Sequence, residues 1–186
     1  MSTEQPCLSG TVLLDTRWAI TQLYGEEVLA RALTSVPYDV RAVYEAATHL
    51  SWVPCEQAHQ VYDAVAREVG LSPRDMAERI VPLSVERSIK TVWRAFLGVS
   101  ASDDALIARA PLLYARSRSV GTMTARVTGP GVAEMVIRNW PKMPEREISS
   151  LALGAASILR LAGRRAVRAD TLSTPDGGRI TVRWRG

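Results

Sequence analysis

Two side chains that could act together chemically, Cys55 and His59, are four residues apart in a stretch whose apolar spacing predicts a helix over 55–69. Cys55 would begin this helix, where the helix dipole stabilises a thiolate. An enzyme that uses the thiol as nucleophile and the imidazole as base is therefore one hypothesis. The only other histidine is His49, and the two cysteines and two histidines lack the spacing of a zinc site. A buried thiol near a surface histidine is the simpler interpretation, so we predict no catalytic residue and no metal.

A second candidate is the segment Tyr114-Ala-Arg-Ser-Arg118, where hydroxyls and guanidinium groups are close in sequence. Tyr114, Arg116 and Arg118 could together contact an anion, because arginine binds carboxylates and phosphates through two hydrogen bonds. The alternative is a solvated connection between a helix and a strand, since such connections lie on the surface.

The charge of the chain is uneven. Residues 1–113 hold 10 Arg and Lys against 14 Asp and Glu, whereas residues 114–186 hold 13 against 5, so the net charges are −4 and +8. A basic surface of this kind can bind nucleic acid. Aromatic residues that could stack on bases do not interleave with the arginines, and solvated strand faces in an arginine-rich chain explain the pattern as well. We therefore do not take nucleic-acid binding through an arginine-rich sheet face as the main role, and we keep it as an alternative.

Four runs in the last third alternate between apolar and polar residues, which predicts four strands. The runs cover 121–128, 132–140, 167–172 and 179–185. Gly and Pro residues separate the runs within each pair, as hairpin turns require. Residues 145–162 show helical spacing between the second and third strands, with Trp140 expected on the polar side of the second strand. A sheet with one apolar face needs helices as a cover.

The first two-thirds of the chain has the pattern of short helices, broken near Pro37, Pro54, Pro82 and Pro111. We predict an α+β fold in which N-terminal helices pack on a four-stranded antiparallel sheet. Residues 1–10 are expected to be flexible. Residues 11–186 are expected to form a single domain, with a helical part over 11–117 and a sheet part over 118–186.

One predicted helix, over 84–97, is richer in large apolar residues than the others. Helices that turn over a sheet commonly leave an apolar crevice between the layers. A candidate apolar pocket therefore lies between this helix and the apolar face of the sheet, lined by Val85, Ile89, Val92, Trp93, Phe96, Met123, Ala125, Met135 and Ile137. If these side chains instead fill the space, the protein acts through its surface, as a homodimer or a scaffold for a partner.

The sequence also excludes several classes of protein. No apolar run approaches the roughly 18 residues of a membrane span, and the N-terminus lacks a signal pattern, so a cytoplasmic protein is expected. Two segments contain closely spaced glycines, Gly129 with Gly131 and Gly177 with Gly178. Neither segment lies between a predicted strand and a predicted helix, as a phosphate-binding loop would, so we predict no cofactor.

A resemblance to known families covers most of residues 11–186. It is carried by Thr91-Val-Trp-Arg-Ala-Phe96, by Pro111-Leu-Leu-Tyr-Ala-Arg116, by Gly121-Thr-Met-Thr and by Pro175-Asp-Gly-Gly with Val182-Arg-Trp-Arg185. These runs resemble a large paralogous family of myxobacterial proteins, which supplies no activity to carry over. The order of elements resembles the superfamily of haem-nitric-oxide-binding domains, vinyl-reductase-like ligand sensors and the small subunits of the TRAPP tethering complex.

The resemblance implies a regulatory or signalling module without catalytic function, which binds a small apolar ligand or a protein partner. Members of the haem branch bind iron through a histidine on a helix ahead of the sheet and hold the propionates with Tyr-x-Ser-x-Arg. Here no histidine follows His59, and Arg116 stands where that motif has serine. The cysteine pattern of the vinyl-reductase-like sensors is missing as well.

Overall fold

The computed structural model describes residues 5–91 and 102–186, and the chain divides into two compact units. The helical unit consists of Met1–Ser84 and Ser117–Ser119, and the sheet unit of Val85–Arg116 and Val120–Gly186. The predicted α+β fold with a four-stranded antiparallel sheet is confirmed. The first unit boundary falls after Ser84, so residues 85–116 belong to the sheet unit. A single domain over 11–186 stays a prediction.

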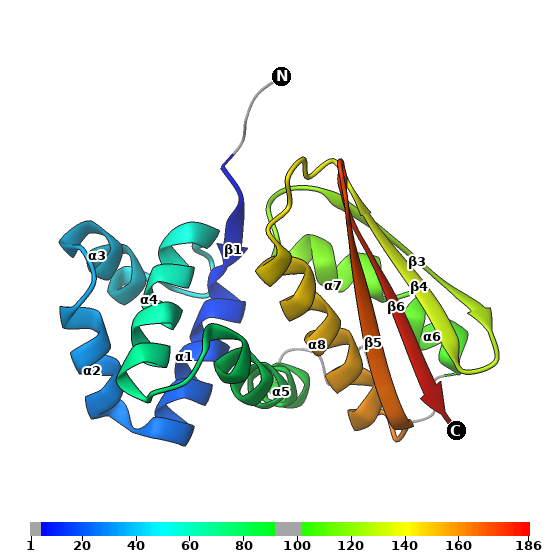
Figure 1. Cartoon of the computed structure of the whole chain (residues 1–186), viewed down its shortest axis with the longest axis horizontal. Coiled ribbons are helices and arrows are strands. Elements are labelled where there is room, and N and C mark those ends of the chain that lie inside the picture. The colour runs from blue at the N-terminus through cyan, green and yellow to red at the C-terminus, as the bar shows by residue number, and fades with distance from the viewer. Residues whose placement is uncertain (1–4, 92–101) are drawn as a thin grey trace. The chain divides into compact units, whose positions relative to one another are not determined.

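The helical unit contains four complete helices, the first part of a fifth and a two-stranded sheet (Figure 1). Among the described residues, no helix is both long and apolar enough to cross a membrane. The elements are β1 (Cys7–Ser9), α1 (Gly10–Tyr24), α2 (Glu26–Thr34), α3 (Tyr38–Ala46), β2 (Trp52–Pro54), α4 (Cys55–Glu68) and α5 (Pro73–Thr91).

The strand β1 corrects the expectation of a flexible N-terminus through residue 10. Leu8 pairs with Val53 of β2, and both side chains are buried. Gly10 follows directly, and a Cβ there would lie 1.8 Å from the Thr48 carbonyl oxygen, so no other residue fits this approach. The backbone N–H of Ser119 donates to the Cys7 carbonyl at 3.1 Å. The sequence did not reveal this pairing because a three-residue strand carries too little alternation to detect.

Helix α5 corrects a second expectation. The Ser72 hydroxyl accepts from the Asp75 N–H at 3.1 Å and so caps the start of the helix. The helix then continues through Pro82, where the sequence predicted a break. A proline inside a helix costs about 3 kcal/mol. Burial of Met76 and Ile80 on the preceding turns offsets part of this cost.

The described residues of the sheet unit form the last part of α5, three further helices and four strands (Figure 1). The elements that follow α5 are α6 (Asp103–Ile107), α7 (Ala110–Ser117), β3 (Thr122–Gly129), β4 (Val132–Arg138), α8 (Glu145–Leu161), β5 (Arg165–Thr174) and β6 (Gly177–Arg185). The strand order is β3-β4-β6-β5 and every pairing is antiparallel, so β3 and β5 are the edge strands.

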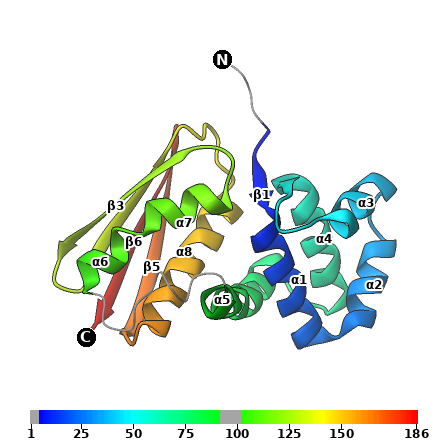
Figure 2. The ribbon, with the colours of Figure 1, turned by 180° about the vertical axis from the view of Figure 1, so that it is seen from behind.

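One face of this sheet, the inner face, is covered by helices. Gly178 lies so close to α8 that a Cβ there would be 2.2 Å from Ile148 Cδ1. Trp184, six residues on and therefore on the same face, contacts Asp103 of α6. Helix α8 packs against β5 and β6, and α6 against β3 (Figure 2). The predicted inward phase of the strands is confirmed, with the buried core formed by Ala133, Met135, Ile137, Ile180, Val182 and Trp184.

Trp140 departs from the predicted pattern. It was expected on the polar side of the second strand, but it is buried. The strand ends at Arg138, and Asn139 has a φ of 60°, which turns the chain before Trp140. Alternation therefore stops applying two residues earlier than the sequence suggested.

Candidate functional site

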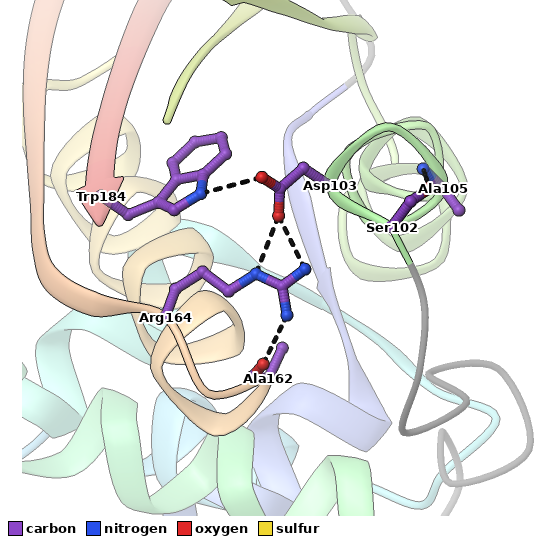
Figure 3. Close-up of polar contacts among 6 residues, drawn as sticks. All are labelled: Ser102, Asp103, Ala105, Ala162, Arg164 and Trp184. Atoms are coloured by element: carbon purple, nitrogen blue, oxygen red, sulfur yellow. Dashed lines mark hydrogen bonds and ion pairs between the residues drawn. The ribbon is translucent and has the colours of Figure 1, made fainter. Parts of the chain in front are cut away.

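The most developed polar cluster among the described residues is centred on Asp103, the first residue of α6 (Figure 3). Its Oδ1 accepts from Arg164 Nε at 2.8 Å and from the same guanidinium through Nη2 at 2.7 Å. Its Oδ2 accepts from the indole N–H of Trp184 at 3.2 Å. Arg164 Nη1 also donates to the Ala162 carbonyl at 2.6 Å. We call Asp103, Arg164 and Trp184 the Asp103 node.

The local sequence explains how the node is positioned. Ser102 caps α6, because its hydroxyl accepts from the Ala105 N–H at 3.3 Å. Asp103 is thereby left to reach the sheet. Arg164 lies in the turn between α8 and β5, after Gly163 with a φ of 87°. The node thus joins the start of α6, the end of β6 and the turn after α8.

The hydrogen bonds of the Asp103 node favour a structural role over a catalytic one. Both carboxylate oxygens already accept hydrogen bonds, so the carboxylate is oriented and charge-balanced. The Arg164 side chain is only 20% exposed and the Asp103 side chain 35%. A charge-balanced pair at this depth fixes geometry more than it offers a base. Sequence reasoning missed the node because its partners are 61 and 81 residues from Asp103 in the chain.

The candidate anion contact has members in different environments. The buried Tyr114 donates its hydroxyl hydrogen to the Val120 carbonyl at 2.8 Å. Arg118 is only 8% exposed, its backbone pairs with Leu8, and its Nη1 donates to the Ser117 carbonyl at 3.1 Å. Arg116 is exposed. The side chains of Tyr114 and Arg118 therefore donate hydrogen bonds to nearby backbone carbonyls. Anion binding by these residues stays a prediction.

The candidate apolar pocket is only partly within the described residues. Val92, Trp93 and Phe96 lie outside them. Val85 and Ile89 are half-buried on α5, and Val85 approaches the Cβ position of Gly154 on α8 at 4.0 Å. Helix α8 in turn packs on β5 and β6.

The sheet side of this candidate pocket is not uniform. Met135 and Ile137 on β4 are buried. Met123 and Ala125 on the edge strand β3 are only half-buried. The apolar inner face is therefore less covered along β3 than along β4, and a pocket there stays a prediction.

The Cys55 and His59 pair lies on α4, as predicted. Cys55 is the first residue of the helix and is buried, and its N–H donates to the Pro6 carbonyl at 2.9 Å. His59 is half-buried with its ring 6.4 Å from that of Tyr62, edge to face. Among residues 5–91 and 102–186, no three His, Cys, Asp or Glu side chains gather as a metal site would require.

The helical unit also holds a buried polar group, the Tyr44 hydroxyl, that the sequence did not single out. Tyr44 is buried on α3, and its hydroxyl has no hydrogen-bond partner within the described residues. Burial raises the pKa of Tyr44 well above 10.0, the nearby Tyr62 raises this pKa further, and the positive charge of Arg17 lowers it. The Arg17 guanidinium lies 6.0 Å from the centre of the Tyr44 ring.

Comparison with known proteins gives a likeness in fold. No known family profile matches the chain, and no curated protein matches it by sequence. Among solved structures, an oxygen-binding H-NOX domain related to soluble guanylate cyclases superposes with a TM-score of 0.72 at 11% identity, covering 96% of each chain.

Two further H-NOX structures superpose with similar TM-scores, also at low sequence identity. The Fe(II) unliganded H-NOX protein of K. algicida has a TM-score of 0.71 at 9% identity over 96% of this chain and 97% of its own. A variant of the T. tengcongensis protein has a TM-score of 0.67 at 14% identity over 96% and 98%. The chain therefore has the fold of an H-NOX domain over nearly its whole length, and identities this low extend the likeness to the fold alone.

Proposed function

We propose that this protein is a non-catalytic regulatory or signalling module that binds a small apolar ligand or a protein partner, and that it does so without haem. The observation that carries the proposal is the H-NOX fold over 96% of the chain in a sequence without a histidine after His59. One of the neighbours is described as an oxygen-binding domain, which favours a binding role for this fold.

The residues of this chain do not fit haem as the resembled family holds it. The two histidines, His49 and His59, both precede α5, so no imidazole lies on the helices directly ahead of the sheet. Tyr114 matches the tyrosine of the propionate motif, but its hydroxyl donates to the Val120 carbonyl. Arg116 replaces the serine. We therefore derive no chemistry through a haem group.

A binding role also agrees with the candidate catalytic residues. The sequence indicates no third residue that would complete a catalytic group with Cys55 and His59. The Asp103 carboxylate accepts hydrogen bonds from Arg164 and Trp184. These observations support a module that acts by binding. We place it in the cytoplasm, and the residue runs given above support a relation to the myxobacterial paralogous family.

The inner side of β3 is where we propose that an apolar ligand or partner binds. Met123, Ala125 and Val127 alternate along this edge strand and all three are half-buried, whereas the corresponding positions of β4 and β6 are buried. An apolar group placed against β3 would complete a burial that the chain itself leaves partial.

Purified protein tests the proposal in two measurements. Visible absorption should show no haem band, either as isolated or after addition of haemin. Native mass spectrometry should show either a mass above the 20.4 kDa chain that is lost on denaturation, or a dimer. Stoichiometric haem incorporation would contradict the proposal, and so would a bare monomer that binds no protein partner.

A matched pair of variants then tests the location. Met123→Lys places a charge on the half-buried inner side of β3, and Thr124→Lys places the same charge on the exposed side of the same strand. Loss of the bound mass or of the dimer in Met123→Lys alone supports the β3 site. Equal loss in both variants, with both proteins folded, would remove it.

A further inference from the structure

The outer face of the sheet carries a concentration of arginines where β5 begins and β6 ends. Arg165 is paired with Arg185, and Arg168 with Arg183, across the two strands. Residues directly opposite in an antiparallel pair lie on the same side of the sheet, and all four side chains belong to exposed residues. We call these four residues the arginine cluster.

The arginine cluster opposes the stability of the sheet. Like charges placed directly opposite each other on two strands are destabilising. One carboxylate, that of Asp170, forms an ion pair with Arg183. Arg165, Arg168 and Arg185 form no ion pair within the part of the chain that the structure describes. Three cations therefore remain for a ligand of opposite charge.

The same face shows what arginines in this setting bind. Glu134 on β4 lies between two arginines, with Oε1 3.1 Å from Arg126 and Oε2 3.4 Å from Arg179. A carboxylate standing on a strand thus fits between guanidinium groups presented by neighbouring strands. The partner of the arginine cluster should supply carboxylates in the same way.

Arg165 and Arg168 of the cluster lie on the edge strand β5, which favours an extended peptide segment as the partner. Within residues 5–91 and 102–186, β5 pairs with β6 alone, so the other side of its backbone faces away from the sheet. An extended segment can add to such an edge by backbone hydrogen bonding. Its alternate side chains then stand on one face at the spacing of the sheet, about 7 Å apart. Glutamates or aspartates at alternate positions would lie beside the arginine cluster.

The exposed side chain of Leu172 favours a protein as the partner over a nucleic acid. It lies on the outer face near the far end of β5 and is 58% exposed. An apolar side chain beyond the acidic positions of a peptide would cover it. The described residues of the outer face include no aromatic side chain on which a base could stack, because Trp184 faces inward.

We propose that the arginine cluster and the outer edge of β5, an edge strand of the sheet, dock an acidic, extended segment of a partner protein, with an apolar residue that covers Leu172. The proposal rests on the protein-partner form of the proposed function and names the surface and the chemistry of that partner.

Binding of a labelled synthetic peptide, measured by fluorescence anisotropy, tests this inference. The peptide alternates glutamate with threonine and ends in valine, and a second peptide has glutamine in place of each glutamate. The test variant combines Arg165→Gln, Arg168→Gln and Arg185→Gln. The matched control combines Arg31→Gln, Arg41→Gln and Arg74→Gln, which removes the same charge from exposed sites of the helical unit.

We expect the glutamate peptide to bind the native protein in a salt-dependent way and the glutamine peptide to bind at least about tenfold more weakly. The cluster variant should lose about tenfold in affinity, and the control variant should change by less than about twofold. Leu172→Ser should weaken binding without altering its salt dependence. Melting curves of each variant establish that the fold is intact.

Three results would overturn the inference: no peptide binding, equal loss in both triple variants, or tighter binding of duplex DNA that depends on the same arginines. Self-association lost in the cluster variant, without peptide binding, would assign the surface to a second copy instead. The absorption and mass measurements are independent of these outcomes, so the docking surface can fail while the proposed function stands.

Discussion

The two units of this protein differ in net charge and in the surroundings of two of their polar groups, the Tyr44 hydroxyl and the Asp103 carboxylate. The helical unit has 7 Arg against 11 Asp and Glu, a net charge of −4, whereas the sheet unit has 16 Arg and Lys against 8, a net charge of +8. In the helical unit the buried Tyr44 hydroxyl has no partner among the described residues. In the sheet unit Asp103 is satisfied by two side chains from distant parts of the chain.

This contrast separates two sources of order. In the helical unit, apolar packing holds short helices together and tolerates an unsatisfied hydroxyl, because burial of apolar surface is not directional. In the sheet unit, a directional polar contact fixes where α6 meets the sheet. Disturbing polar atoms should therefore cost more in the sheet unit, and the following substitutions test that expectation from the largest effect to the smallest.

Trp184→Ala should lower the free energy of unfolding by about 3–5 kcal/mol, the cost of removing a buried aromatic side chain. Trp184 is 6% exposed and also donates to Asp103. Chemical denaturation followed by circular dichroism measures the change. The control is Trp52→Ala in the helical unit, because Trp52 is 48% exposed and should cost far less. Equal losses in the two variants would contradict the burial of the inner face.

Asp103→Asn should destabilise the protein by about 1–2 kcal/mol, because it leaves the partly buried Arg164 guanidinium without its counter-charge. The neighbouring Asp104→Asn removes the same charge from an exposed position in the same helical turn and should cost only a few tenths of a kcal/mol. The two variants are compared by denaturant midpoint. If Asp104→Asn is the more damaging, the Asp103 node does not hold α6 in place.

Substituting the two buried tyrosines should have opposite effects. Tyr114→Phe removes a hydroxyl that donates to the Val120 carbonyl and should destabilise by about 1 kcal/mol. Tyr44→Phe removes a hydroxyl without a described partner and should be neutral or stabilising by up to about 1 kcal/mol. Thermal melting resolves the sign. Destabilisation by Tyr44→Phe would indicate a water or ligand bound to that hydroxyl.

The smallest expected effect is a loss of stability in alkali that originates in the helical unit. Burial holds the pKa of Tyr44 in the folded protein above its unfolded value of 10.0, so the folded state favours the neutral phenol. This contribution is fully present below pH 10 and is lost as the pH rises from 10 through the folded pKa. Unfolding free energies measured across this range should fall less steeply in Tyr44→Phe. Tyr38→Phe, at an 85% exposed position, should follow the native curve.

Local patterns in the sequence determined the elements of the sheet unit. Alternation over 121–128 and over 179–185 identified β3 and β6 with the correct inward residues, because a half-buried strand repeats every two residues. Helical spacing over 145–162 identified α8 to within one residue. Ser102 is of a residue type that favours helix N-caps, and capping is likewise a local interaction.

Where the sequence failed, the deciding interaction was short or distant. The strand β1 was missed because its three residues are stabilised by pairing with β2, more than forty residues away. Helix α5 passes through Pro82 because packing overrode a local preference. Trp140 is buried because one positive φ at Asn139 turns the chain after β4.

The candidate sites divide in the same way. Residue types and local spacing were enough to predict the apolar inner face and the arginines on the strands, because both follow from the alternation of a single strand. The Asp103 node, the opposition of Arg165 to Arg185 and of Arg168 to Arg183, and the partial cover of β3 depend on which strands are neighbours and in what register. Register is set when the buried faces of several elements pack together, so only the tertiary structure decided these features.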